Sequence, residues 1–246
     1  MTGIRVAVIG AAGRMGSTTC AAIEAAPDLD LVAELDVDND IAAGLTAADV
    51  AVIFSIPSTA PDHVMTCIGA GVHAVVGTTG WTPEQLATVA GALDDAPAIG
   101  VLVAPNFALG AILLMQFAAQ AARHFESVEI IELHHPDKAD APSGTARHTA
   151  EAIAQARAEA RMDISPDATT SQLDGARGAS VAGVRVHSVR LRGLVAHEEV
   201  LLGGPGEQLM LRHDSFDRVS FMPGVLLGVR TVRSRPGLTV GLENYL

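Results

Sequence analysis

The chemistry of this chain is concentrated between Glu132 and Thr145. The segment contains two adjacent histidines, His134 and His135, and Lys138, which is the only lysine among the 246 residues. A histidine and a lysine can each act as a general acid once their surroundings adjust their proton affinity. A Ser-Gly-Thr sequence follows, typical of a helix start, where backbone N–H groups and hydroxyls bind anions. The segment therefore predicts a site that binds a carboxylate-bearing substrate and gives it a proton.

The same residues also have simpler explanations. Ser143 could serve only as the N-cap of its helix, although that role is compatible with ligand contact. His134 and His135 could be structural. The His-His-Pro-Asp group could bind a metal, but its spacing matches no familiar ligand set, so no metal site is predicted. The histidines without comparable neighbours are expected to be structural: His63, His73, His124, His148, His187 and His197.

A glycine-rich motif near the start of the chain predicts a dinucleotide site. The motif is Gly10-Ala11-Ala12-Gly13-Arg14-Met15-Gly16. Glycines placed between a strand and a helix let the backbone turn tightly and approach a pyrophosphate, although such a turn could also only pack helix on strand. Asp36 ends the next predicted strand twenty residues after Gly16, where an acid usually binds an adenosine ribose. No arginine follows Asp36 closely, so NADH should at least be tolerated.

Two further segments lie where predicted strands end. They are Gly77-Thr78-Thr79-Gly80 and Ala104-Pro105-Asn106-Phe107. A doubly wound sheet presents this edge to its ligand, so both segments are expected beside the nicotinamide, although each could be an ordinary turn. Arg218, at the start of the closing helix, is a further candidate for a cofactor contact.

Alternating strands and helices surround these motifs in the first part of the chain. The predicted strands are 4–9, 31–35, 50–55, 73–76 and 100–103, and the predicted helices are 14–26, 61–70 and 83–93. This alternation is typical of a parallel, doubly wound sheet.

The pattern changes after Pro105. Long helices are predicted at 108–125 and 143–161, a strand at 128–133, an exposed loop at 163–180, and three successive antiparallel strands at 184–191, 194–202 and 208–213. A final helix over 216–232, kinked at Pro223, would return to the first domain. The fold class is therefore α/β, with an N-terminal Rossmann-type doubly wound parallel sheet and a second α+β domain on a mixed or antiparallel sheet. The predicted domains are 1–105 with 214–246, which binds the dinucleotide, and 106–213.

Composition narrows the function classes. The net charge is −12 and no stretch concentrates basic residues, which argues against nucleic acid as a partner. Cys20 and Cys67 form no CxxC motif and are expected to be buried thiols of a reducing compartment. No apolar run reaches the roughly 18 to 20 residues that a membrane helix needs, so we expect a cytoplasmic protein without a membrane partner.

With these residues in hand, the chain resembles the 4-hydroxy-tetrahydrodipicolinate reductases, long called dihydrodipicolinate reductases, from Val6 to about Gly237. The most specific element is Glu132 to Ala146, which is similar to that family's signature E-x-H-H-x-x-K-x-D-A-P-S-G-T-A. The resemblance implies an NADH- or NADPH-dependent reduction of a cyclic dicarboxylate in lysine and diaminopimelate biosynthesis. It also implies a homotetramer assembled through the sheet of the second domain.

The resemblance further assigns roles to individual residues. His134 would be the catalytic acid, or would orient a water that protonates the product, and Lys138 would be its partner. The residues that would hold the substrate carboxylates are His135, Lys138, Ser143, Gly144 and Thr145. The residues that would bind the cofactor are Gly10, Ala12, Gly13, Arg14, Met15, Asp36, Gly77, Thr78, Thr79, Ala104, Pro105, Asn106 and Phe107.

Two positions depart from the family pattern. Ile53 stands where many members have an aspartate, which argues against a polar role there. Ala12 stands where some relatives carry a lysine, so the phosphate contact would fall to Arg14 or to the backbone.

Two other functions are also compatible with the sequence. The chain could be another two-domain dehydrogenase of amino-acid metabolism, which would not need the His-His-Lys-Ser-Gly-Thr cluster. It could also be a nucleotide-binding regulator, which would bind NADH without oxidising it.

Overall fold

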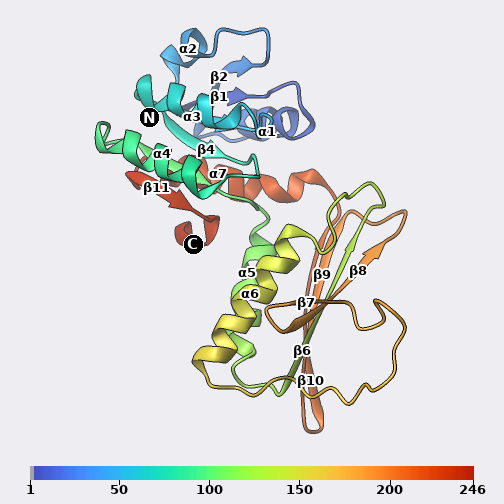
Figure 1. Ribbon diagram of the computed structural model, residues 1–246. Coiled ribbons are helices and arrows are strands. Elements are labelled where there is room, and N and C mark those ends of the chain that lie inside the picture. The colour runs from blue at the N-terminus through green and yellow to red at the C-terminus, as the bar shows by residue number, and fades with distance from the viewer. Residues whose placement is uncertain (1–2) are drawn as a thin grey trace. The chain divides into compact units, whose positions relative to one another are not determined.

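A computed structural model describes residues 3–246 (Figure 1). The chain divides into two compact units: residues up to Ala108 together with Arg218–Leu246 form the first, and Leu109–Asp217 form the second. The sequence places these boundaries after residue 105 and before residue 214. The closing segment of the chain therefore completes the unit in which the chain began.

The first unit is built on a six-stranded parallel sheet with the order β11-β5-β4-β3-β1-β2. Its strands are β1 (Ile4–Ile9), β2 (Leu29–Leu35), β3 (Val50–Ile53), β4 (His73–Val76), β5 (Gly100–Val103) and β11 (Gly237–Val240). The central strands are continuous apolar runs because a sheet covered on both faces has no solvent side. The sequence reasoning missed β11, which extends the sheet beside β5.

Helices cover both faces of this sheet (Figure 1). They are α1 (Arg14–Glu24), α2 (Ile41–Gly44), α3 (Ala60–Gly69), α4 (Pro83–Asp94) and α7 (Met222–Val232), with 3-10 turns η1 (Leu45–Ala47), η2 (Arg218–Phe221) and η3 (Leu242–Tyr245). Val64 of α3 and Val89 of α4 share a core with Ala7 and Ile9. On the other face, Gly228 of α7 lies against Val75 and Leu102. The predicted Rossmann-type doubly wound sheet is confirmed.

The prediction of one kinked helix over residues 216–232 is wrong. The segment forms η2 and then α7, and Pro223 lies in the first turn of α7. A proline is tolerated there because the N–H that it lacks would have no partner within the helix.

The second unit carries a five-stranded mixed sheet with the order β10-β9-β6-β8-β7. Its strands are β6 (Ser127–His134), β7 (Ala179–Val181), β8 (Val184–Arg190), β9 (Ala196–Gly204) and β10 (Glu207–Ser215), and its helices are α5 (Leu109–Ala121) and α6 (Gly144–Glu159). The three antiparallel strands predicted in succession are only partly correct. β6 lies between β8 and β9 and runs parallel to β8, because α6 and the following loop are long enough to make that crossover.

Helices α5 and α6 pack side by side on one face of this sheet (Figure 1). Val128 and Ile130 of β6 share a core there with Leu114 of α5 and Ile153 of α6. On the other face, Glu129 is paired with Arg177 of the long loop, which forms no helix or strand from residue 163 to residue 178. Alternate residues of β6 therefore serve two different surfaces.

Within residues 3–246 no helix is long and apolar enough to cross a lipid bilayer.

The close backbone approach at Gly16 gives a test of the first unit. A Cβ at Gly16 would lie 2.0 Å from the carbonyl oxygen of Gly10, whereas a Cβ at Gly69, the last residue of α3, meets nothing within 4 Å. We expect Gly16→Ala to lower the free energy of unfolding by about 2 kcal/mol or more, because backbone rather than a flexible side chain must move. Gly69→Ala should leave it unchanged or slightly higher. Equal effects in urea denaturation would contradict this explanation of the loop.

Candidate active site

The glycine loop between β1 and α1 is shaped to receive an anion. Gly10 has φ +84°, and a Cβ there would lie 2.6 Å from the carbonyl oxygen of Phe54. Gly13 is the N-cap of α1, makes no side-chain capping bond, and no acidic residue lies in the first turn. The start of α1 therefore combines a positive helix end with a backbone that a ligand can approach closely.

Asp36, at the end of β2, is tied to this loop. Its carboxylate accepts hydrogen bonds from the N–H groups of Ala12 and Val37, each at 2.9 Å. The bonds from Val37 and Ala12 lower the pKa of Asp36, so the group is ionised at neutral pH. Asn39 fixes the turn because its side-chain oxygen accepts from the N–H of Asp36 at 2.7 Å. An ionised acid is thus held beside the loop.

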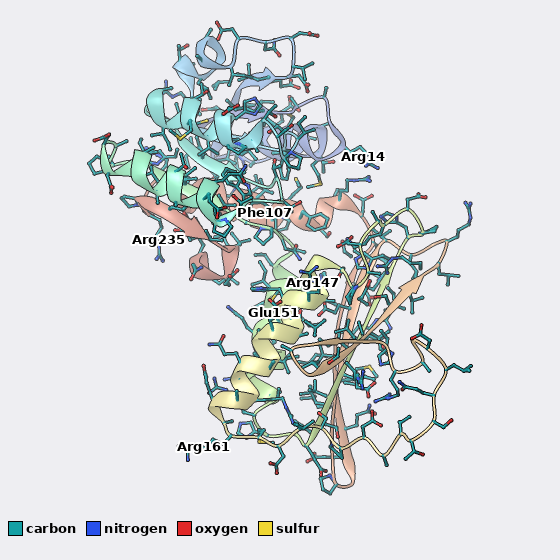
Figure 2. All side chains as sticks on the ribbon, viewed as in Figure 1. Arg14, Phe107, Arg147, Glu151, Arg161 and Arg235 are labelled. Carbon is teal, nitrogen blue, oxygen red and sulfur yellow. The ribbon has the colours of Figure 1, made fainter. Side chains whose placement is uncertain are left out.

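Two neighbouring hollows adjoin the loop. The larger has a volume of about 520 Å³, and its lining includes Gly10, Gly13, Asp36, Ile41 and His63. The other, of about 340 Å³, is lined by Gly13, Arg14, Met15, Phe54, Ser55, Pro57, Gly77, Thr78, Thr79 and Arg218. Arg14 lies at the N-terminal end of α1 (Figure 2). The structure thus brings together predicted cofactor residues from four separate segments.

The Ala104–Phe107 segment lies behind this surface. Ala104 and Phe107 are buried, and the Phe107 ring (Figure 2) packs edge-on against Phe54, with 6.2 Å between centroids. The side-chain oxygen of Asn106 accepts from the N–H of Ala108 at 2.8 Å. Phe54 lines both hollows, so Phe107 supports their wall. Ile53 is fully buried in the sheet and places no polar group in either hollow.

The second centre, in the second unit, is organised by Glu132 near the end of β6. Its side chain is completely buried. Both oxygens accept from the guanidinium of Arg190 on β8, at 2.8 and 2.9 Å, and one also accepts from the N–H of Ser143 at 3.2 Å. The other contacts Nδ1 of His134. Glu132 thus joins two strands to the start of α6.

These contacts keep Glu132 ionised despite its burial. Burial alone would raise its pKa, but hydrogen bonds from His134, Arg190 and Ser188 lower the pKa to about 2. A planar guanidinium that makes two parallel bonds is the best available partner for such a carboxylate. The charge of Glu132 is therefore permanent over the range in which enzymes work.

The contact with Glu132 orients His134. A carboxylate accepts only, so Nδ1 carries the hydrogen, and Nε2 is the ring atom left to exchange a proton with a ligand. The ring is 13% exposed, which leaves it accessible at one edge. A histidine held in this way can exchange a proton with a ligand at Nε2.

Asp140 holds Lys138 over the first turn of α6. Lys138 Nζ donates to one oxygen of Asp140 at 2.6 Å, and the N–H of Gly144 donates to the other at 3.1 Å. Ser143 is the N-cap, because its hydroxyl accepts from the N–H of Ala146 at 3.2 Å. His135 is exposed, and Thr145 lies in the same first turn. The six residues predicted around the substrate therefore share one end of the sheet and one helix terminus.

Sequence reasoning missed Arg190, Asp140 and the anchoring role of Glu132. Asp140 and Glu132 lie inside the recognised segment, so their partners could have been sought there. Arg190 is distant in sequence, and nothing around it distinguishes it from the other arginines. In the first unit His63 was expected to be structural, yet it bonds Ser55 at 3.0 Å and lines the larger hollow. No cluster of three or more His, Cys, Asp or Glu side chains that could hold a metal occurs among residues 3–246.

Comparisons with known proteins agree over the whole chain. Residues 4–107 match the family model for the N-terminus of dihydrodipicolinate reductase, and residues 110–246 match the model for its C-terminus. The chain is 58% identical over 247 residues to the 4-hydroxy-tetrahydrodipicolinate reductase of Streptomyces griseus, covering 100% of this chain and 99% of the relative. It is 59% identical over 243 residues to that of Beutenbergia cavernae, covering 99% and 98%.

A solved structure shows the same likeness. The dipicolinate-bound dihydrodipicolinate reductase from Paenisporosarcina sp. TG-14 has a TM-score of 0.89 and 39% identity, covering 100% of both chains.

The Arg190–Glu132 pair gives a test of the second centre. Arg190→Met should lower the free energy of unfolding by about 3 kcal/mol, because it leaves a fully buried carboxylate without its main partner. Arg185→Met is the matched control on the same strand. Arg185 is 37% exposed and lies 4.0 Å from Asp167, so its loss should cost under about 1 kcal/mol. Urea denaturation of both variants would refute the assignment if the two losses were equal.

Proposed function

We propose the function of this chain from one premise: it belongs to the dihydrodipicolinate reductase family. It is an NAD(P)H-dependent oxidoreductase that reduces 4-hydroxy-tetrahydrodipicolinate to tetrahydrodipicolinate in lysine and diaminopimelate biosynthesis. The observation that carries this function is the cluster from Glu132 to Thr145, whose geometry combines a proton donor with an anion site. Neither a different amino-acid dehydrogenase nor a regulator would need that combination.

We assign substrate binding to the second unit. A cyclic dicarboxylate would meet Lys138, His135 and the N–H groups of Gly144 and Thr145 at the start of α6, where the helix dipole favours negative charge. Asp140 already accepts from both Gly144 and Lys138, so a substrate carboxylate would share these donors with Asp140. Ser143 uses its hydroxyl as the N-cap and contributes by fixing the position of this turn.

We assign to His134 the role of proton donor. Glu132 holds the Nδ1–H of the ring, so Nε2 is the atom that faces a ligand and gives up its proton to the reduced ring. Because Arg190 neutralises Glu132, the carboxylate orients the histidine without itself taking the proton. Lys138 is assigned as the partner that keeps the substrate in register with Nε2.

We assign cofactor binding to the first unit. The groups that would hold the pyrophosphate are the N–H groups of Arg14 and Met15 in the first turn of α1, with the Arg14 side chain beside them. Gly10, Ala12 and Gly13 would shape the turn that the pyrophosphate approaches, because their own N–H groups are bonded within the protein. Gly77, Thr78, Thr79 and Arg218 line the adjoining hollow, and Ala104 to Phe107 support its wall. NADH or NADPH supplies a hydride when bound. The shared lining of the two hollows supports one extended ligand.

The apolar surface of the second sheet supports the assembly expected for the family. Ile131, Leu133, Leu201 and Met210 lie on the face opposite α5 and α6, and Met210 is 53% exposed. A second copy of the chain would bury this face, and we propose a homotetramer formed through it. We also place the enzyme in the cytoplasm, which accords with its two free buried thiols, Cys20 and Cys67.

Substitution of the catalytic pair tests the reaction. The assay couples the protein to a dihydrodipicolinate synthase supplied with pyruvate and aspartate semialdehyde, and follows cofactor absorbance. His134→Asn should lower kcat by about 10² or more, because the donor is lost. Lys138→Met should lower kcat and raise KM for the substrate, each by about tenfold or more, because the charge contact that holds the substrate in register with Nε2 is lost. His148→Asn, on the exposed side of α6, is the control and should be unaffected. Full activity in both site variants would rule out the mechanism.

The charge on Asp36 tests cofactor choice. Asp36→Asn keeps an oxygen for the N–H of Ala12 but removes the negative charge near a 2′-phosphate. The ratio of kcat/KM for NADPH to that for NADH should rise about fivefold to tenfold. Asp38→Asn, in the same turn but exposed, should leave the ratio unchanged. An unchanged ratio for Asp36→Asn would show that this carboxylate does not face the ribose.

A further inference from the structure

Glu198 of β9 is a buried carboxyl that the proposed reaction does not use. It is 5% exposed and lies directly opposite Glu132 in the antiparallel pairing of β9 with β6. On β10, the strand on the other side of β9, His213 pairs with Glu198. On β8, the strand on the other side of β6, Ser188 pairs with Glu132. Residues paired across strands point to the same face of a sheet. A polar row, His213–Glu198–Glu132–Ser188, therefore crosses the helix-covered face beside His134.

The partners of Glu198 indicate that it carries a proton. Within residues 3–246 its Oε1 atom is buried without a hydrogen-bond partner. Thr149 of α6 lies beside the carboxyl, and its hydroxyl also bonds the carbonyl oxygen of Thr145 at 3.0 Å. An ionised Glu198 would therefore have one shared hydroxyl to stabilise its buried charge, which favours the protonated form.

Electrostatics lead to the same assignment. Burial raises the pKa of Glu198 to about 7, against the hydrogen bond from Thr149, which lowers it, and the neighbouring charge of Glu132 raises it further. Two carboxylates side by side away from water repel, so one of them keeps its proton. Glu132 takes the charge because Arg190 binds it at both oxygens, whereas Glu198 has no cation bound to it.

We propose that Glu198 is a positioning residue of the reaction: the charge on its buried carboxyl, acting beside Glu132, sets how firmly His134 holds the proton that it donates. The proposal rests on the function proposed above, in which His134 is the acid. When Glu198 is neutral, the charges of Arg190 and Glu132 balance. When it ionises, the additional negative charge favours the protonated form of His134. The enzyme therefore keeps its acid to higher pH than it would without Glu198.

Other groups around Glu198 also influence the charges of Glu198 and His134. Glu132 and His134 face it from β6, and Arg190 and Ser188 lie beyond them on β8. His213 faces it from β10 and packs on α5 at Gly110, while Thr149 faces it from α6. Burial lowers the pKa of His213, so that ring is neutral at neutral pH and leaves the negative charge of Glu198 uncompensated from that side.

Glu198→Gln tests the proposal because it keeps the shape and removes the ionisable group. In the coupled assay, kcat should match the unsubstituted enzyme at pH 6 and be about fivefold lower at pH 8.5, with KM unchanged. The NMR titration midpoint of the His134 ring should move down by about half a unit to one unit. Glu199→Gln is the matched control, since Glu199 is the next residue, faces the other side of the sheet and pairs with Arg212. It should leave both profiles unchanged.

The NMR measurement separates the two proposals. An unsubstituted protein without turnover would refute the proposed function, whereas an unmoved His134 midpoint in Glu198→Gln would refute the role of Glu198. A purely structural residue would alter stability but not the pH profile. If Glu198→Gln does not fold, the NMR titration of His134 in the unsubstituted enzyme tests the proposal instead. Its His134 signals should show a second inflection near the pH at which Glu198 ionises, and a single inflection would overturn the proposal.

Discussion

One buried negative charge organises the second unit. Glu132 is excluded from water, so its carboxylate must receive hydrogen bonds from every direction, and the chain supplies them from β6, β8 and the start of α6. Satisfying that charge brings Arg190, which lies 58 residues from Glu132 in sequence, to the same point as His134 and Ser143. The geometry that we propose for catalysis is thus a consequence of a stability requirement. A carboxylate that must be satisfied here also fixes which edge of the His134 ring is available to a ligand.

The two proposed ligand sites both lie at the start of a helix, but they differ in which groups remain to bind an anion. At α1, Gly13 provides no side-chain cap, and the turn is left open to an anion. At α6, the carboxylates of Glu132 and Asp140 accept from Ser143 and Gly144, so two of the first N–H groups are already engaged. The second site therefore depends more on a side-chain cation. This explains why the only lysine of the chain stands there, held at 2.6 Å from Asp140, while the first site can rely on backbone and arginine.

Local patterns in the sequence were sufficient for much of this fold. Five of the six parallel strands of the first unit were predictable because buried strands are continuous apolar runs, whereas β11, which is only partly buried, was missed. The His134–Lys138 cluster was predictable because its members are close in sequence. What failed depends on distant partners. The position of β6 between β8 and β9 follows from the crossover through α6, and strand patterning alone does not order strands. Arg190 was unpredictable for the same reason, since only the register of β8 beside β6 brings it to Glu132.

Glu198 and Glu199 show how far one residue of register changes the chemistry. In sequence they are equivalent neighbours. Successive side chains of a strand point to opposite faces, so Glu199 reaches Arg212 at the more open face, while Glu198 points under α6 toward Glu132. The first carboxylate has a cation as its partner. The second meets another carboxylate and one shared hydroxyl, and one of its oxygens is buried without a partner among the described residues. The different surroundings of two identical side chains are therefore set by strand direction and register.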